Sequence, residues 1–243
     1  MSKPLKDASI PFREHLVELR QRIIKSLLVI TFFFIVTFNY SREILNFLSK
    51  PLLPFLTNGN MVYLNLSDGF FLFFKVSLVV ALVLSAPFII YQIFMFMAPG
   101  LYDNEKRFIK ILIAIASLSF ITGFILLYQI VLPIFFSFFS KFIFDFYEVF
   151  PRADDYLDFV LKFNLYAGVL FMIPFGVFIL DYAKILPLQR LVEIRPGVII
   201  ISFILAAAIT PPDVISQILV SAIILILFET GILVTKIKHA FFK

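Results

Sequence analysis

The sequence predicts an all-α polytopic membrane protein with six transmembrane helices, and two observations decide this. Of its 243 residues, 61% are hydrophobic and 15% are charged, whereas soluble domains are about half apolar and a quarter charged. The apolar residues form long continuous runs rather than the alternation of roughly ten residues that a β-barrel shows. Because only helices and closed barrels can span lipid, these runs predict helices. We expect a single membrane domain over residues 1–243.

Six apolar stretches are the predicted spans. They lie at residues 23–40, 70–97, 108–138, 157–182, 196–210 and 214–233. The second span contains Pro87, which predicts a bend, and the third is so long that it should tilt or break at Pro133. The last two spans are short and flank the sequence TPPD at 210–213. Since proline cannot continue a helix, they predict a tight hairpin and local thinning of the bilayer.

Two further features lie between the predicted spans. The stretch 43–56 is expected to be amphipathic, because Leu45, Leu48 and Leu52 recur at helical spacing. The connection between the third and fourth spans is predicted to be a polar loop rich in acid. Its acidic residues are Asp145, Glu148, Asp154, Asp155 and Asp158.

Basic residues set the predicted orientation. Six spans place both termini on one side, and 15 of the 21 Lys and Arg residues fall in the termini and loops of that side. Because cytoplasmic loops carry the excess of Lys and Arg, both termini are predicted to be cytoplasmic. The net charge of +5 is therefore a signal of topology, and we expect no nucleic-acid partner.

The composition also narrows the chemistry. There is no Cys, and the two histidines, His15 and His239, lie near opposite ends of the chain. A metal site is therefore not expected, and no nucleophile–base pair is evident, so we expect neither cofactor nor catalysis. A secondary transporter of small solutes is the main alternative, although no internal repeat is visible. A membrane-embedded hydrolase and a scaffold or insertase without arginine selectivity are further alternatives.

Separated stretches carry a family pattern. They read HLVELRQR at 15–22, SAPFIIYQ at 85–92 followed by APGLYDNEKR at 98–107, RP at 195–196, and TPPDVISQ at 210–217 followed by FE at 228–229. Together they resemble the TatC family, the largest subunits of the twin-arginine translocase, over nearly the whole chain. The resemblance implies a six-span, glove-shaped protein of the cell inner membrane that binds the Arg-Arg motif in signal peptides of folded cargo. It also implies self-association, single-span TatA- and TatB-type partners, and export driven by the proton-motive force.

Glu18 and Glu105 are the predicted binding site for the two arginines. The planar guanidinium of arginine is always charged and pairs with carboxylates, and both acids lie on the predicted cytoplasmic side. Spacing alone favours an ordinary helix-face pair between Glu18 and Arg22 and a solvated loop charge for Glu105. The resemblance favours binding, because both acids fall on family positions associated with it. Arg20 would orient Glu18 or hold lipid headgroups, and Phe96, also at a family position, would line the groove or serve as core.

Six further residues are functional candidates. They are Pro51, Lys75, Gln92, Gln129, Asp213 and Glu229. Charge within a span is costly and usually functional, which singles out Lys75 and Glu229; snorkelling to the interface is the alternative for Lys75. Asp213 is placed to cap the sixth helix. The two glutamines are expected to form hydrogen bonds between helices, and Pro51 matches a family position.

The fourth span departs from the family pattern. The family usually carries Glu or Gln shortly before a proline in this span, whereas residues 168–174 read GVLFMIP and place Met172 at that position. The polar group thought to contact a partner's transmembrane helix is therefore absent. We hypothesise that Gln129 or Asn164, the nearest polar candidates, supplies a shifted contact, unless a partner tolerates the loss or the chain is a diverged paralogue.

Overall fold

The computed structural model describes residues 12–55, 61–63, 65–97, 106–143, 151–182, 184–210 and 213–241. Its elements in chain order are α1 (Phe12–Asn39), α2 (Ser41–Ser49), the 3₁₀ turn η1 (Leu53–Phe55), α3 (Leu66–Met97), α4 (Lys106–Leu126), the π-helical turn η4 (Leu127–Val131), α5 (Leu132–Ile143), α6 (Ala153–Leu170), α7 (Ile173–Tyr182), α8 (Leu188–Glu193), α9 (Arg195–Ile209) and α10 (Val214–Phe241). Within these ranges the all-α prediction is confirmed.

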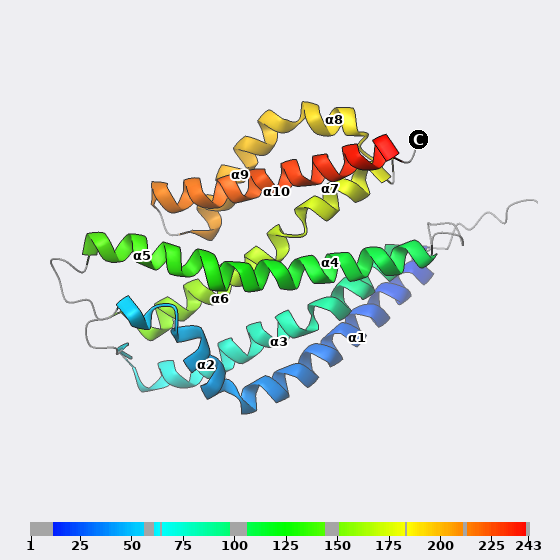
Figure 1. Ribbon diagram of the computed structural model, residues 1–243. Helices are drawn as coiled ribbons and strands as arrows, with labels where there is room; N and C mark the ends of the chain where they lie inside the picture. The colour runs from blue at the N-terminus through cyan, green and yellow to red at the C-terminus, as the bar shows by residue number, and fades with distance from the viewer. Residues whose placement is uncertain are drawn as a thin grey trace, which may run out of the picture.

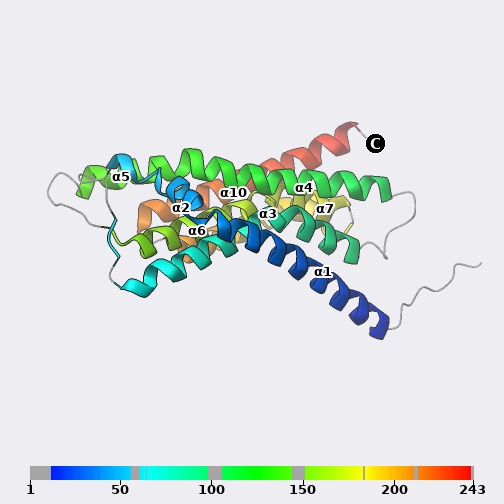
Figure 2. The ribbon, with the colours of Figure 1, turned by 90° about the horizontal axis from the view of Figure 1, so that it is seen from below.

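Five stretches of the described chain are helical, long and apolar enough to cross a bilayer. They are His15–Asn39, Ser67–Phe96, Ile111–Ser140, Ala153–Tyr182 and Val214–Ala240. The 15-residue helix α9 is a shorter apolar helix. The long helices run along one axis, with α1 and α3 on one side and α9 and α10 on the other, and Figure 2 shows α1 slanting away from the layer that the others form (Figure 1). The predicted class, with six apolar helices, is therefore confirmed.

Three apolar clusters hold the helices together. The largest joins α2, α3, α6 and η4 with α5, α9 and α10, and includes the fully buried side chains of Leu72 and Val160. A second joins α3, α4 and α7 around Ala116. The third joins α7, α8 and α10 around Leu191 and Ile232. The lipid-facing surface keeps many apolar side chains exposed, as expected where lipid is the solvent.

The amphipathic helix predicted after the first span is present as α2. Its apolar stripe packs into the largest cluster, where Leu45, Leu48 and Leu52 are 8%, 2% and 6% exposed. The hydroxyl of Tyr156 on α6 donates to the carbonyl of Leu48 at 2.8 Å. The stripe and this hydrogen bond seat α2 across the ends of α3 and α6.

Two glycines let α4 and α6 approach closely. A Cβ at Gly168 on α6 would lie 2.7 Å from Cε2 of Phe120, and one at Gly123 on α4 would lie 2.6 Å from Cβ of Phe171. Small residues at such crossings are how membrane helices approach without a hydrophobic driving force between them. This crossing fixes the position of α6, and with it the polar side chains at its start.

The third predicted span forms one continuous rod through α4, η4 and α5, without a break at Pro133. Proline has no N–H for the carbonyl one turn earlier, and its ring crowds that carbonyl. The chain accommodates this by widening to a π-helical turn at Leu127–Val131, immediately before Pro133. The third span is therefore continuous, and its one irregular turn contains Gln129.

The fourth predicted span, by contrast, is divided. Helix α6 ends at Leu170 and α7 begins at Ile173, so the candidate span Ala153–Tyr182 contains an interruption that was not predicted from the sequence. Pro174 explains the interruption, since it cannot donate to the carbonyl four residues earlier. Met172 lies in the break, and its N–H donates to the carbonyl of Val169 at 3.0 Å.

The predicted acidic loop is also partly helical. Asp154, Asp155 and Asp158 lie on α6, which begins at Ala153. Negative charge is favourable in the first turn of a helix, which explains why the helix begins before its apolar stretch. Asp145 and Glu148 lie outside the described residues.

The two last helices pack against each other, as the predicted hairpin requires. Helix α9 is short, as predicted, whereas α10 has 28 residues and continues past the predicted end at 233 to Phe241. Thr210 is extended, with φ −95° and ψ 158°. The N–H of Ser216 donates to Oδ1 of Asp213 at 2.7 Å, so Asp213 caps α10 as predicted. The two prolines of the turn lie outside the described residues.

Candidate functional site

The start of α1 and the end of α3 meet through two side-chain contacts. The ring of His15 stacks on Phe96, with centroids 4.2 Å apart and an interplanar angle of 21°. Nη1 of Arg22 on α1 donates to Oε1 of the buried Gln92 on α3 at 3.1 Å. Gln92 thus forms the predicted hydrogen bond between helices. Both contacts lie at the end of the bundle where α10 also ends (Figure 1).

Glu18 lies one helical turn before Arg22. Nε of Arg22 donates to Oε1 of Glu18 at 3.0 Å, and Nη2 contacts the same oxygen. The Glu18 side chain is 28% exposed, against 18% for Arg22, so the carboxylate is reachable from solvent. The helix-face pair predicted from spacing is therefore present, and Arg22 connects it to α3. We refer to these residues, His15, Glu18, Arg22, Gln92 and Phe96, as the Glu18 cluster.

The two other predicted site residues on this side are Arg20 and Glu105, and neither belongs to the Glu18 cluster as the structure describes it. Arg20 on α1 is exposed. Glu105 lies outside the described residues, because the description ends at 97 and resumes at 106. The structure thus describes the environment of one of the two predicted carboxylates.

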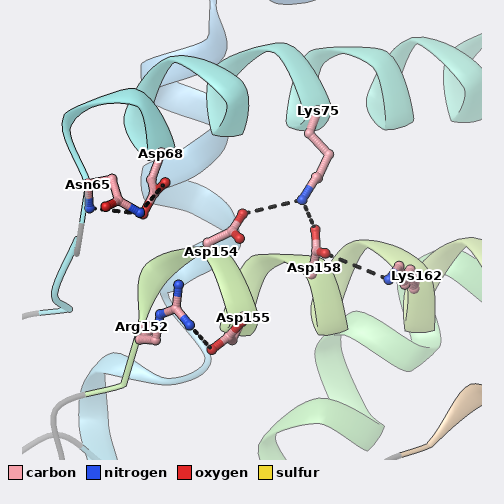
Figure 3. Close-up of polar contacts among 8 residues, drawn as sticks. All are labelled: Asn65, Asp68, Lys75, Arg152, Asp154, Asp155, Asp158 and Lys162. Carbon is pink, nitrogen blue, oxygen red and sulfur yellow. Dashed lines mark hydrogen bonds and ion pairs between the residues drawn. The ribbon is translucent and has the colours of Figure 1, made fainter.

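Lys75 joins α3 to α6 at the opposite end of the bundle. Its Nζ lies 3.3 Å from Oδ1 of Asp154 and also contacts Oδ1 of Asp158, as Figure 3 shows. Nζ of Lys162 lies 3.7 Å from Oδ2 of Asp158. The sequence singled out Lys75 as a functional or snorkelling residue, but the pairing partners on α6 were missed. We refer to Lys75, Asp154, Asp158 and Lys162 as the Lys75 cluster.

Glu229 also has a partner on a neighbouring helix. Nη2 of Arg195, at the first residue of α9, donates to Oε2 of Glu229 on α10 at 2.6 Å. The two side chains are 39% and 48% exposed. This pair bridges the two arms of the hairpin, between the first residue of α9 and the middle of α10.

A buried carboxylate, Asp181, was not predicted as a site residue. Its side chain is 4% exposed and lies near the end of α7. It accepts from the N–H of Leu188 at 3.0 Å and from Nζ of Lys238 at 3.2 Å, and Nε2 of His239 lies 2.9 Å away. The Lys238 ammonium also lies 5.0 Å from the centroid of the Tyr182 ring. We refer to Asp181, Leu188, Lys238 and His239 as the Asp181 cluster.

The polar candidates for a partner contact differ in their accessibility. Gln129 is exposed on the π-helical turn η4. Asn164 is 1% exposed, and its Nδ2 donates to the carbonyl of Val160 at 2.8 Å. Met172 is half-buried and packs against the second apolar cluster. Pro51 is buried in the turn that follows α2. Gln129 is thus the candidate that the bilayer or a partner can reach.

The helices and their polar clusters together indicate the class of protein to which this chain belongs. Long apolar helices with charged and polar clusters at both ends characterise a polytopic membrane protein. The described residues bring no group of three or more His, Asp or Glu side chains into a metal-binding arrangement. The family model of the Sec-independent protein translocase protein (TatC) matches residues 14–222. The chain therefore belongs to the TatC family of protein translocase components, as its sequence motifs predicted.

Individual relatives agree with this assignment. The chain is 35% identical over 231 residues to the Sec-independent protein translocase protein TatC of Haemophilus influenzae, covering 95% of this chain and 90% of the relative. It is 32% identical to TatC of Escherichia coli strain K12, covering 91% and 86%. A crystal structure of the twin arginine translocase receptor TatC superposes with a TM-score of 0.82 at 30% identity, covering 93% of this chain and 99% of that one.

Proposed function

We propose that this chain is the receptor subunit of its translocase and binds Arg-Arg signal peptides of folded cargo through Glu18 and Glu105. The observation that carries the proposal is the environment of Glu18, whose accessible carboxylate is held in place by a cluster spanning α1 and α3. A solved relative is described as the twin arginine translocase receptor. Family membership favours this role over the transport of small solutes. Uptake of a solute by proteoliposomes that contain this chain alone would instead support the transporter alternative.

The geometry of Glu18 suits exchange of one guanidinium for another. Both contacts of Arg22 go to Oε1, and in the described part of the chain Oε2 has no such contact. A second guanidinium can therefore approach Oε2, or replace Arg22, without first exposing a buried charge. Charge-assisted pairs of this kind are short and directional. Phe96 lies in the same cluster, where its ring stacks on His15, and in the proposed site it would line the groove that receives the peptide.

The proposed orientation places this site in the cytoplasm. Helix α1 begins and α10 ends at the same end of the bundle (Figure 1), as six spans require, and 15 of the 21 Lys and Arg residues were assigned to this side. The excess of basic residues marks it as the cytoplasmic side of the cell inner membrane. Cargo made in the cytoplasm would then meet Glu18 directly, with the proton-motive force acting on the assembled translocase.

The test is binding of a twin-arginine signal peptide to the purified protein in nanodiscs. We expect the Arg-Arg peptide to bind more tightly than its Lys-Lys counterpart. Glu18→Gln and Glu105→Gln should each weaken binding by about tenfold to a hundredfold, the cost of losing a hydrogen bond to a charged group. Glu193→Gln is the matched control, since Glu193 is exposed on α8 outside the cluster. Equal binding of both peptides, unaffected by either substitution, would contradict the receptor role.

Gln129 is the proposed contact for a single-span partner of the TatA or TatB type. It is exposed on the irregular turn η4, and π-helical turns occur frequently at functional sites. Asn164 is enclosed and would serve only after α6 moved. Gln129→Leu should therefore reduce co-purification of a TatA- or TatB-type partner, whereas Thr122→Leu, at an exposed polar position on α4, should not. Undiminished co-purification by a variant in which Gln129 and Asn164 are both Leu would exclude the shifted contact.

A further inference from the structure

A cavity of about 580 Å³ lies beside α2, at the end of the bundle away from Glu18. This volume lies within the range of about 300–1,000 Å³ that is usual for small-molecule sites. Its lining comes from α2, η1, residues 61–63 and the first turns of α3 and α6. The N–H of Val62 donates to the carbonyl of Pro151 and the N–H of Ala153 to that of Val62, each at 3.1 Å. These backbone hydrogen bonds join residues 61–63 to the start of α6, and together the two segments form the wall of the pocket that faces α2. We refer to this cavity as the α2 pocket.

The polar side of the pocket is one face of α2 together with the residue that follows the helix. Arg42, Asn46 and Ser49 recur at helical spacing beside the buried leucine stripe, whose Leu45 also lines the pocket, and Lys50 follows. Arg42 and Lys50 are exposed, and the Lys50 ammonium lies 5.6 Å from the centroid of the Phe47 ring. In the described ranges neither cation forms an ion pair, and no carboxylate lines the pocket. The pocket therefore presents two cations and neutral hydrogen-bonding groups.

The neighbouring cations are arranged differently. Among the described side chains at this end of the bundle, Lys75 and Lys162 face aspartates of α6, and Arg152 lies 3.5 Å from Asp155. Only the two cations of the α2 pocket lack such a partner within that set. Two unopposed positive charges on a concave surface attract an anion. Asp154 and Asp158 pair with Lys75 and Lys162 instead, as Figure 3 shows.

The rest of the lining is apolar, which restricts the kind of anion. Phe73 of α3 and Leu157 of α6 form the wall toward the interior of the bundle, with Leu53 on η1 beside them. Phe73 and Leu157 belong to the candidate spans that begin at Ser67 and Ala153. The pocket therefore lies near the ends of these two membrane-spanning stretches. Tyr63 also lines it, and tyrosine is enriched at this level of a bilayer. An occupant must be anionic at one end and apolar at the other.

We propose that the α2 pocket binds an anionic phospholipid. Arg42 and Lys50 hold the phosphate-bearing headgroup, Asn46 donates to its oxygens, and the first part of an acyl chain lies against Phe73 and Leu157. The two cations are eight residues apart, about 12 Å along a helix, which matches a headgroup with its glycerol ester region better than a single phosphate ion. Burial of the acyl chain adds a hydrophobic contribution that inorganic phosphate lacks.

The test is lipid binding to the delipidated full-length protein, measured by native mass spectrometry during titration with phosphatidylglycerol. Phosphatidylcholine with the same acyl chains is the zwitterionic comparison. Arg42→Gln combined with Lys50→Gln should weaken phosphatidylglycerol binding by about thirtyfold, at ~1 kcal/mol for each basic residue, and should leave phosphatidylcholine binding unchanged. The matched control is Lys184→Gln combined with Arg190→Gln, which removes the same charge from exposed positions outside the pocket. It should change phosphatidylglycerol binding less than about threefold.

The remaining outcomes separate a lipid from a free anion. Glycerophosphate in millimolar excess should fail to displace phosphatidylglycerol, because it lacks the acyl chain. Complete displacement would mean that the pocket holds a soluble phosphate, and would overturn the lipid proposal. Equal losses in the pocket variant and the control variant would overturn it too, since they would show a general effect of net charge. The thermal unfolding midpoint of each variant confirms that the comparison is made between folded proteins.

Discussion

The Glu18 and Asp181 clusters lie at the same end of the bundle but hold their carboxylates in different ways. Asp181 is 4% exposed and is contacted by three groups, from α8 and from the last turn of α10. Glu18 is 28% exposed and its contacts come from one residue, Arg22, on its own helix. The first carboxylate connects three helices, whereas the second connects to α3 only through Arg22 and Gln92.

Under the proposed function, this difference separates a carboxylate that holds the fold together from one that binds a ligand. A buried carboxylate that is fully engaged can accept a new ligand only by giving up contacts that hold the fold. An accessible carboxylate in a local pair gives up little, because exposed pairs are worth about 0–1 kcal/mol. Intramembrane or buried charge alone therefore does not identify a binding site in this protein. The availability of the carboxylate to a second guanidinium is the better criterion, and it selects Glu18 over Asp181.

The largest expected effect on stability is that of Asp181→Ala. The substitution leaves the N–H of Leu188 and the side chains of Lys238 and His239 without their common acceptor. Removing one partner of a buried charge pair usually costs 3–5 kcal/mol, and the exposure of His239 lowers the expectation to about 2–3 kcal/mol. The free energy of unfolding is measured by titration with SDS in mixed micelles.

Glu193→Ala is the matched control for Asp181→Ala. Glu193 is an exposed acid on α8, and surface substitutions usually change stability by less than about 0.5 kcal/mol. A loss for Asp181→Ala no larger than that of the control would show that the buried cluster does not hold the end of α10. Asp181 could then no longer be regarded as a carboxylate that stabilises the fold.

A smaller effect is expected at the Lys75 cluster, which is intermediate in exposure. Lys75→Met leaves Asp154 and Asp158 facing each other without the cation between them (Figure 3). The side chains are 39%, 34% and 29% exposed, so solvent screens the repulsion and the expected loss is about 1 kcal/mol. The same SDS titration measures it.

A double-mutant cycle isolates the charge pair at Lys75. Asp158→Asn added to Lys75→Met removes the repulsion between the carboxylates, so the double variant should be more stable than Lys75→Met alone. Simple additivity of the two losses would mean that the residues act independently. The contact between Lys75 and Asp158 would then contribute packing alone.

Local patterns predicted the helices well, because their causes are local. The apolar runs, the leucine stripe of α2 and the capping by Asp213 each depend on residues within a few turns of one another. The pair between Glu18 and Arg22 was predictable for the same reason, since four residues form one helical turn. The break around Met172 was missed, although Pro174 is visible in the sequence. A proline alone does not predict a break, since Pro87 lies within an unbroken α3 whereas Pro174 follows an interruption. Which proline interrupts a helix depends on its neighbours in the fold.

The charged clusters between helices could not be predicted in this way. Lys75 and Asp154 are 79 residues apart in the chain, and Asp181 is 57 residues from Lys238. Spacing along one helix carries no information about such pairs, because they arise from how α3 meets α6 and how α10 meets α7. The sequence could therefore identify Lys75 as an unusual charge but not its partners. Asp181 was missed altogether, since an acid at the end of an apolar run reads as an ordinary boundary.

The smallest expected effect on stability is that of Glu18→Gln. Glutamine keeps an Oε1 acceptor for Arg22, and the ionic contribution of a pair one helical turn apart is about 0.3–0.5 kcal/mol. The free energy of unfolding should therefore change by less than about 0.5 kcal/mol. Binding of the Arg-Arg peptide, measured on the same preparation, should still fall strongly, because in the proposed site the lost charge is the one that pairs with the peptide.

Gln92→Leu is the companion variant for Glu18→Gln. It removes the acceptor that anchors Arg22 to α3 and leaves the charge of Glu18 unchanged, so it should weaken peptide binding less than Glu18→Gln does. A loss of stability for Glu18→Gln as large as that for Asp181→Ala would place Glu18 among the structural carboxylates. Weaker peptide binding would then reflect a disturbed α1, and the contrast between the two clusters would no longer identify the receptor site.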